Sequence, residues 1–301
     1  MTFADRLAEL VAARESQIVL GLDPDPARLW PDALGATPPD GAPAQRAAAA
    51  VQAHCAALID AAGPACVAVK PQLACFERLG APGWAALAAT ADHARRQGLL
   101  VVADGKRGDI SVSAAAYAQA LVGSTPTPFG DVDGLGADAF TANPLLGVDA
   151  LEPLVDGARA AGAGVFVLVR TSNPGAKDIE DLAVAGGGTV WERLAHIVAQ
   201  LGAPPSPHSG LSDIGAVVGA TAPEHVARMR ELMPHAPFLL PGIGAQGGRV
   251  EDMAPAFAPG RAGGLVSASR SIATAHESTG AAPARAARAE AERLREAAWS
   301  L

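Results

Sequence analysis

The sequence predicts a (β/α)8 barrel, also called a TIM barrel, in which residues 1–301 form a single domain. Eight short apolar runs recur along the chain, and most are followed by an alanine-rich segment with helical periodicity. The runs are about 25 to 45 residues apart, which suits a closed barrel of ~250 residues. An open doubly wound sheet is the alternative. Closure is favoured because there are eight runs and no GxGxxG motif follows the first one.

The elements are expected in a regular order. The predicted strands are SQIVLGLD, PACVAVKP, GLLVVADG, ADAFTANP, AGVFVLVR, IGAVVGAT, APFLLPG and AGGLVSAS. An N-terminal helix precedes the first strand, and further helices are predicted over Pro82 to Gln97, Trp191 to Leu201, Pro223 to Leu232 and, at the C-terminus, Pro283 to Trp299. The proline- and glycine-rich segments Thr37 to Ala44 and Ser124 to Gly136 are predicted to be loops.

Composition argues against several classes of protein. A net charge of −8 argues against nucleic-acid binding, which needs basic patches. No apolar run approaches the ~18 residues of a membrane span, and the acidic, helix-patterned N-terminus is unlike a signal peptide, so we expect a cytoplasmic protein. The three cysteines Cys55, Cys66 and Cys75 lack CxxC spacing, which indicates packing roles. No His or Cys cluster predicts a catalytic metal.

Polar residues follow most of the predicted strands. In a parallel barrel the strands end at the same rim, where reactive groups lie. Any one of these residues could simply open a turn, so the prediction of a site at this rim depends on the whole set. The set comprises Asp23, Lys70, Asp104, Lys106, Asn143, Ser172, Thr221, the loop Gly242 to Gly248, Ser269 and Arg270.

The segment VVADGKRGDI contains the densest group of charges at this rim. Asp104 and Lys106 are two residues apart, so their side chains project the same way if the strand continues. Only three of the 23 basic residues are lysines, and Lys70 ends the preceding strand. Alternating carboxylates and ammonium groups keep one another ionised, and a substrate carboxylate beside Asp104 would be repelled until it left as CO2. The alternative is a solvated turn.

Two further segments indicate a phosphate site. GIGAQGG, residues 242–248, includes Gln246 and Gly247 and follows the seventh predicted strand. Ser269 and Arg270 follow the eighth, where barrels commonly bind phosphate through a glycine loop and the start of a short helix. Tight turns alone would also explain the glycines. In TSNPGA, Ser172 is available to read the hydrogen-bonding edge of a ligand, although turn chemistry also accounts for this segment.

Taken together, ADGKRGDI, TSNPGA and GIGAQGG, in this order between GLDPDP and SASRSI, resemble the orotidine 5'-phosphate decarboxylase family in its longer-chain bacterial branch. The resemblance implies conversion of orotidine 5'-phosphate to uridine 5'-monophosphate and CO2 in pyrimidine biosynthesis. It also implies that the enzyme uses neither a metal nor an organic cofactor, and that it is a homodimer with shared active sites. Two features depart from the family pattern: VSASR lacks an Asn after the Val, and the loop Ser124 to Gly136 is long.

The resemblance also implies roles for individual residues. Lys106 would protonate C6 of the pyrimidine, Asp104 would face the departing carboxylate, and Asp109 would enter the site from the other subunit. The remaining implied roles are ribose binding by Asp23 and Lys70, a contact across the interface from Ser113, recognition of the pyrimidine by Ser172, a bridge from base to phosphate by Gln246, and phosphate binding by Arg270.

Three other functions remain open from the sequence. One is a metal-dependent keto-acid decarboxylase with a similar Asp-x-Lys strand, and another is a Schiff-base aldolase that uses Lys106. The third is a phosphate-ligand binding protein without catalysis. A binding protein would tolerate a broken Asp-Lys-Asp set, whereas this sequence keeps the set intact.

Overall fold

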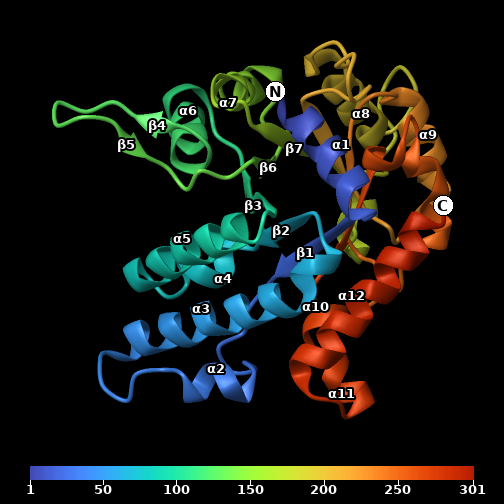
Figure 1. The fold of residues 1–301 in the computed structure, drawn as a ribbon. Helices are drawn as coiled ribbons and strands as arrows, with labels where there is room; N and C mark the ends of the chain where they lie inside the picture. Colours follow the sequence, from blue (N-terminus) through green and yellow to red (C-terminus); the bar gives the residue numbers. More distant parts are fainter.

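The computed structural model describes residues 1–301 and contains a closed barrel of eight parallel strands (Figure 1). Neighbouring strands follow the order β1, β2, β3, β6, β7, β8, β9 and β10, and β10 pairs with β1 to close the barrel. The strands are β1 (Ile18–Leu22), β2 (Ala68–Pro71), β3 (Leu100–Arg107), β6 (Ala139–Ala142), β7 (Gly164–Arg170), β8 (Ile214–Val218), β9 (Phe238–Leu240) and β10 (Gly264–Ala268). One strand lies in each predicted apolar run, so the predicted fold class is confirmed.

Helices surround the barrel and connect its strands. The α-helices are α1 (Phe3–Arg14), α2 (Pro31–Gly35), α3 (Pro43–Ala62), α4 (Leu73–Glu77), α5 (Ala81–Arg96), α6 (Ser111–Leu121), α7 (Val148–Ala160), α8 (Val190–Leu201), α9 (Val226–Leu232), α10 (Arg270–Ala273), α11 (Ala275–Thr279) and α12 (Pro283–Trp299). The 3-10 helices are η1 (Gly63–Ala65), η2 (Pro174–Asp178), η3 (Pro223–His225), η4 (Glu251–Phe257) and η5 (Arg261–Gly263). The predicted helix Pro223 to Leu232 is thus divided, because its first turn is a 3-10 turn.

Two apolar cores account for the stability of this arrangement. The larger comprises 66 buried residues and lies mainly between the strands and the surrounding helices. The smaller, of 15 residues, combines side chains inside the barrel with one face of α1. Strands buried on both faces explain why the sequence shows continuous apolar runs and not an alternating pattern.

Helix α1 closes the end of the barrel at which the strands begin. The Phe3 ring packs edge-on against Phe166, and Gly164 leaves it room, since a side chain at Gly164 would collide with the Phe3 ring. The Arg6 guanidinium donates to the carbonyl of Gly162 at 3.1 Å and to Asp138 at 3.0 Å, and these two residues precede β7 and β6. Ligands must therefore enter from the opposite end, where the strands finish.

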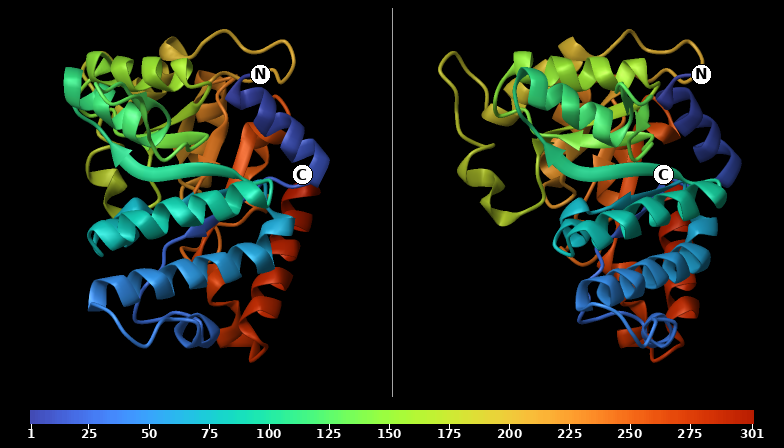
Figure 2. Two further views of the ribbon diagram at one scale, coloured as in Figure 1. Left: turned by 60° about the vertical axis from the view of Figure 1, so that its left-hand side comes forward. Right: turned by 90° about the vertical axis from the view of Figure 1, so that its left-hand side faces the viewer.

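Strand β3 is the longest strand of the barrel and continues beyond its neighbours, as both views of Figure 2 show. Its pairing with β6 is interrupted: Ala103 pairs with Phe140 and Arg107 with Ala142, so β3 advances four residues while β6 advances two. Such a bulge re-aims the side chains of the longer strand. The bulged residues 104–106 are those that the sequence identified as a charge cluster.

The sequence predicted a loop over the whole of Ser124 to Gly136, but part of this segment is regular. It contains a two-stranded antiparallel hairpin of β4 (Ser124–Thr125) and β5 (Val132–Asp133), which projects from the body of the protein in Figure 1. Its strands have only two residues each, which is too short for an alternating apolar pattern to predict them. Phe129, between the two strands, is 99% exposed.

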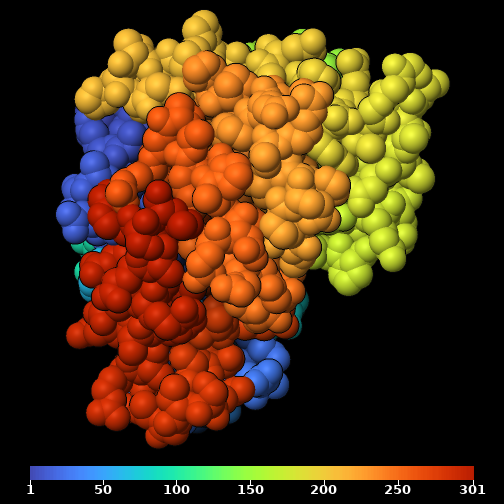
Figure 3. All heavy atoms as spheres, turned by 90° about the vertical axis from the view of Figure 1, so that its right-hand side faces the viewer, coloured from blue at the N-terminus to red at the C-terminus, as the bar shows by residue number.

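The outer surface shows two further features. Figure 3 shows α12 packed along one side of the molecule, and the segment after β7, drawn yellow-green, standing out from the body. That segment contains η2 and leads to α8. No helix combines the length and the apolar character needed to cross a bilayer.

Candidate active site

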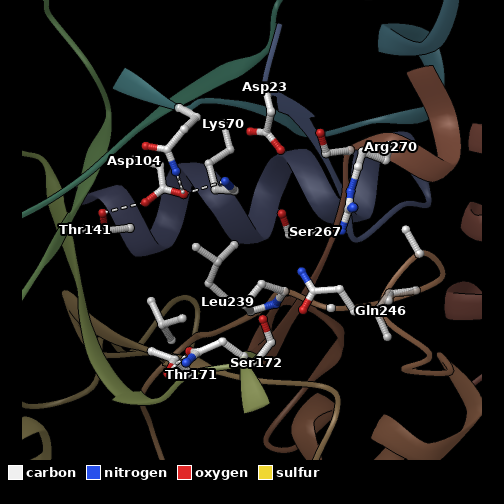
Figure 4. A pocket seen from close by; sticks show the side chains of 18 of the residues that line it. Asp23, Lys70, Asp104, Thr141, Thr171, Ser172, Leu239, Gln246, Ser267 and Arg270 are labelled. Carbon is white, nitrogen blue, oxygen red and sulfur yellow. Dashed lines mark hydrogen bonds and ion pairs between the residues drawn. The ribbon is translucent and has the colours of Figure 1, made fainter. Parts of the chain in front are cut away.

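A cavity of about 340 Å³ opens at the end of the barrel where the strands finish, and 19 residues line it. Eight of the residues predicted from the sequence are among them: Asp23, Lys70, Asp104, Lys106, Ser172, Gln246, Ser269 and Arg270. In Figure 4 the charged group around Asp104 lies on one side of the cavity, and Gln246 and Arg270 lie on the other. The cavity can therefore accommodate a ligand whose two ends differ in chemistry.

Asp104 occupies the centre of the charged group. Its Oδ2 accepts from Lys70 Nζ at 2.5 Å, and its Oδ1 accepts from Lys106 Nζ at 2.7 Å. Two neutral donors complete its surroundings, because Thr141 Oγ1 donates to Oδ1 at 2.9 Å and Gln72 Nε2 to Oδ2 at 3.3 Å. Each carboxylate oxygen thus has two donors, which leaves the side chain little freedom to rotate.

Burial and charge act in opposite directions on this group. Asp104 and Lys70 are 5% and 7% exposed. Burial alone would raise the pKa of Asp104, but Lys70 and Lys106 hold it well below its usual range. Burial alone would lower the pKa of Lys70, but Asp104 and then Asp23 raise it above its ordinary value. Both members of the buried pair therefore stay ionised at neutral pH.

The backbone at Lys106 adopts an unusual conformation. Its φ of +47° lies in the left-handed region, which non-glycine residues rarely enter. Gly105 before it has no room for a side chain, since a Cβ there would lie 2.6 Å from Leu73 Cδ1. The bulge of β3 begins here, and it places the Lys106 ammonium beside Asp104, with the lysine side chain 42% exposed towards the cavity. Strained residues of this kind cluster at functional sites.

The opposite side of the cavity is formed by the glycine-rich loop after β9 and by the start of α10. Gly242, Gly244 and Gly247 all have positive φ, and the Gly244 amide donates to the carbonyl of Gly248 at 2.9 Å, which closes the loop on itself. The loop brings Gln246 to the cavity wall, next to Arg270 in Figure 4. A guanidinium and a side-chain amide at one end of a cavity suit a phosphate group.

Trp30 supports α10 from behind. Its indole N–H donates to the carbonyl of Ala273, the last residue of α10, at 3.0 Å. Its backbone N–H donates to Nδ1 of the buried His54 at 3.1 Å, and the two rings pack edge to face. The indole thus holds the short helix that begins with Arg270.

Ser172 lies at the third side of the cavity, after β7. Its carbonyl accepts from Thr221 Oγ1 at 3.0 Å, which ties it to the loop after β8. Gly219 allows this approach, because a Cβ there would lie 2.8 Å from the Ser172 backbone. Thr221 therefore supports the rim without lining the cavity itself.

Among the predicted site residues, Asp109, Ser113 and Gly247 do not line the cavity of this chain, and neither do the rim residues Asn143 and Thr221. Asp109 Oδ1 accepts from the amide of Ile110 at 2.8 Å, and Ser113 is exposed on α6. Asn143, which the sequence also places at the rim, instead uses its Oδ1 to accept from the Leu145 amide at 3.0 Å.

The cavity also includes polar residues that the sequence analysis did not identify. They are Gln72, Thr141, Thr171, Asn173 and Ser267. Gln72 is two residues after Lys70, Thr141 two before Asn143, and Ser267 two before Ser269. Side chains two apart on a strand share a face, so the period of two could have found Gln72 and Ser267. It would not have found Thr141, because Asn143 does not itself line the cavity.

Comparison with known proteins agrees with this geometry. The model of the orotidine 5'-phosphate decarboxylase / HUMPS family matches residues 16–285. An orotidine 5'-phosphate decarboxylase from Rhodopirellula baltica is 41% identical over 277 residues, which cover 92% of this chain and 90% of that protein. One from Deinococcus radiodurans is 41% identical over 276 residues, or 90% of this chain and 89% of that protein.

Solved structures lead to the same family. The structure of Leishmania donovani OMP decarboxylase is 32% identical and superposes with a TM-score of 0.72, and the match covers 100% of both chains. With the family model, relatives and fold in agreement, the chain belongs to the orotidine 5'-phosphate decarboxylase / HUMPS family.

Proposed function

We propose that this chain, with residues 1–301 as one catalytic domain, converts orotidine 5'-phosphate to uridine 5'-monophosphate and CO2, with Lys106 as the proton donor. The activity follows from family membership and from relatives that match over about nine-tenths of both chains and are orotidine 5'-phosphate decarboxylases. It belongs to pyrimidine biosynthesis. The observation that carries the mechanism is the buried Asp104 carboxylate held between two ammonium groups.

The charged group supports decarboxylation followed by protonation. A substrate carboxylate about 4 Å from Asp104 would be repelled by roughly 4 kcal/mol at an effective dielectric near 20, and release of CO2 would relieve that repulsion. The C6–carboxylate bond breaks, and its electron pair stays on C6 beside the Lys106 ammonium. Lys106 then transfers a proton to C6 and regains one from solvent.

The other walls of the cavity support binding of the rest of the substrate. Arg270 and Gln246, with the amides of the glycine loop and Ser269, suit the phosphate, far from the reacting carbon. Asp23 beside Lys70 suits ribose hydroxyls, and Ser172 suits the edge of the pyrimidine. Phosphate binding energy from this remote end would help to hold the reacting base against Asp104.

We also propose a homodimer in which Asp109 and Ser113 complete the partner's site. Neither residue lines the cavity of its own chain, and the Asp109 carboxylate accepts from the Ile110 amide. Ile110 and Val112, which flank them in the sequence at the start of α6, are exposed, and so are Leu145 and Leu146 in the loop after β6. Burial of such a patch stabilises association. The cytoplasmic location expected from the N-terminal sequence stays a prediction.

A single assay tests the activity. The purified protein is incubated with orotidine 5'-phosphate, with and without EDTA, and the ultraviolet change to uridine 5'-monophosphate is followed. We expect turnover that EDTA does not reduce. Folded protein without turnover would refute the function, whereas loss of activity in EDTA, or trapping of a Lys106 adduct by borohydride, would refute the cofactor-free mechanism in favour of the metal-dependent or Schiff-base alternative.

A further inference from the structure

Thr141 joins two features of the site that have been described separately, the carboxylate of Asp104 and the strained backbone of Lys106. It lies on β6 and is 1% exposed. Its Oγ1 is 2.9 Å from Asp104 Oδ1 and also 2.9 Å from the backbone nitrogen of Lys106. No other side chain contacts both groups through a single atom.

The direction of the two hydrogen bonds is determined by chemistry. A backbone N–H can only donate, so the Lys106 amide donates to Thr141 Oγ1. The ionised carboxylate of Asp104 can only accept, so the single hydroxyl proton of Thr141 goes to Oδ1. The hydroxyl is thus used fully, once as acceptor and once as donor, and its rotation is fixed.

The bulge explains why a side chain is needed at this point. Between the pairs Ala103 with Phe140 and Arg107 with Ala142, Thr141 is the only residue of β6 opposite the bulged residues of β3. The Lys106 amide therefore has no regular strand partner there. The threonine hydroxyl takes the place of the missing carbonyl and holds Lys106 at its positive φ.

We propose that Thr141 is a positioning residue that holds the Lys106 ammonium and the Asp104 carboxylate in the relative positions needed for proton transfer. This inference rests on the proposed decarboxylase function. Thr141 acts through the two charged residues, so its loss misplaces the proton donor and leaves the phosphate end of the cavity unchanged. The effect should fall on kcat and spare the binding of product.

The test compares Thr141→Val, which has the same shape without the hydroxyl, with Thr141→Ser, which keeps the hydroxyl. We expect Thr141→Val to lower kcat about 10- to 100-fold, the scale expected when a reacting group is misplaced, with KM changed less than about 3-fold. Thr141→Ser should stay within about 3-fold of wild type in kcat. Affinity for uridine 5'-monophosphate should be the same in all three proteins.

Thr90→Val is the matched control. Thr90 is equally buried at 1% exposure and donates to the Ala86 carbonyl at 2.7 Å, but it lies in α5, away from the cavity. It should lose stability as Thr141→Val does while keeping wild-type kcat. Wild-type kcat in Thr141→Val, or an equal loss of kcat in Thr141→Ser and Thr141→Val, would overturn the proposal. An inactive wild-type protein would instead refute the decarboxylase function.

A measurement on the wild-type protein covers the case in which Thr141→Val does not fold. Hydrogen exchange followed by NMR should show the Lys106 amide protected in the folded protein, because it donates to a buried hydroxyl. Exchange as fast as that of an exposed loop amide would overturn the proposal, and protection that persists in Thr141→Ser would support it.

Discussion

Asp104 and Lys70 show how a buried ion pair can be retained in an apolar barrel. Taking both charges out of water costs several kcal/mol per ion, which their mutual attraction and further hydrogen bonds must offset. Here Thr141 and Gln72 provide neutral donors to the carboxylate, and Lys106 adds a third charge at the edge of the cavity. We infer that the pair is kept for function, since apolar residues would fill the same space at lower cost.

Removing the Asp104 carboxylate should make the desolvation cost of the buried Lys70 ammonium measurable. In Asp104→Asn the Lys70 ammonium keeps its burial but loses its closest carboxylate. We expect the free energy of unfolding at pH 7 to fall by about 3 kcal/mol, measured by urea denaturation at fixed protein concentration. Adding Lys70→Met should restore most of the loss, while the exposed Lys177→Met should change nothing. Wild-type stability in Asp104→Asn would contradict this account of the pair.

At this scale the sequence was informative about charge and poor about neutral polar residues. Asp104, Lys106 and Lys70 stood out because charged groups at the ends of apolar runs need a reason. Thr141 did not, since threonine is common in strands and its importance depends on a bulge in the neighbouring strand. The positive φ of Lys106 likewise follows from tertiary pairing that no local pattern records.

Among the elements, the corner formed by α2, α3 and α11 is notable because it supports the phosphate end. Trp30 precedes α2, His54 lies in α3 and His276 in α11, and the indole ring packs edge to face against both imidazoles. The sequence predicted the strands from their continuous apolar runs, and helices such as α5, α8 and α12 from a periodicity that extends over many residues. It missed short elements such as α2, α11 and the β4–β5 hairpin, which span too few residues to show a periodic pattern.

This corner should make stability depend on pH. Burial, and then His276, lowers the pKa of His54 from 6.5 to about 4. Between pH 6.5 and 4 the unfolded chain therefore binds more protons than the folded one, so stability is complete above pH 6.5 and is lost as pH falls towards 4. The loss should reach about 3 kcal/mol.

Unfolding by urea at several pH values checks this expectation. His54→Gln removes the titrating group and should flatten the slope within this window, whereas the exposed His196→Gln should leave it unchanged. An equal slope in wild type and His54→Gln would show that another group is responsible. Asp104 contributes in a separate and more acidic window, because its pKa is lowered and its stabilisation is lost only as pH falls below the ordinary carboxylate range.

For the whole molecule, the barrel places residues from distant parts of the chain around one cavity. The fold class was accessible from the sequence, and so were the positions of the eight cavity residues named above, because βα repetition and strand ends determine them. Asp109 and Ser113 are different: their proposed roles depend on a second copy, and only the family resemblance suggested them.

Mixing two inactive variants tests the shared site. Lys106→Ala removes the proposed proton donor from its own site, and Asp109→Ala removes the carboxylate proposed to enter the partner's site. A hybrid dimer of the two has one site that lacks both groups and one intact site. We expect mixed chains to recover activity, up to about a quarter of wild type if subunits exchange at random, measured by the decarboxylation assay. No recovery despite proven exchange would show that Asp109 serves its own chain.

The three lysines of this protein lie in three different environments. Lys177 is exposed on η2, the Lys70 side chain is 9% exposed, and the Lys106 side chain is 42% exposed in the cavity. An amine-reactive label would therefore find Lys177 at all times, Lys70 hardly at all, and Lys106 only while the cavity is empty. With so few competing amines, the extent of Lys106 labelling, measured by peptide mass spectrometry, reports how much of the active site is occupied. The same measurement could be used to screen ligands without a chromophore.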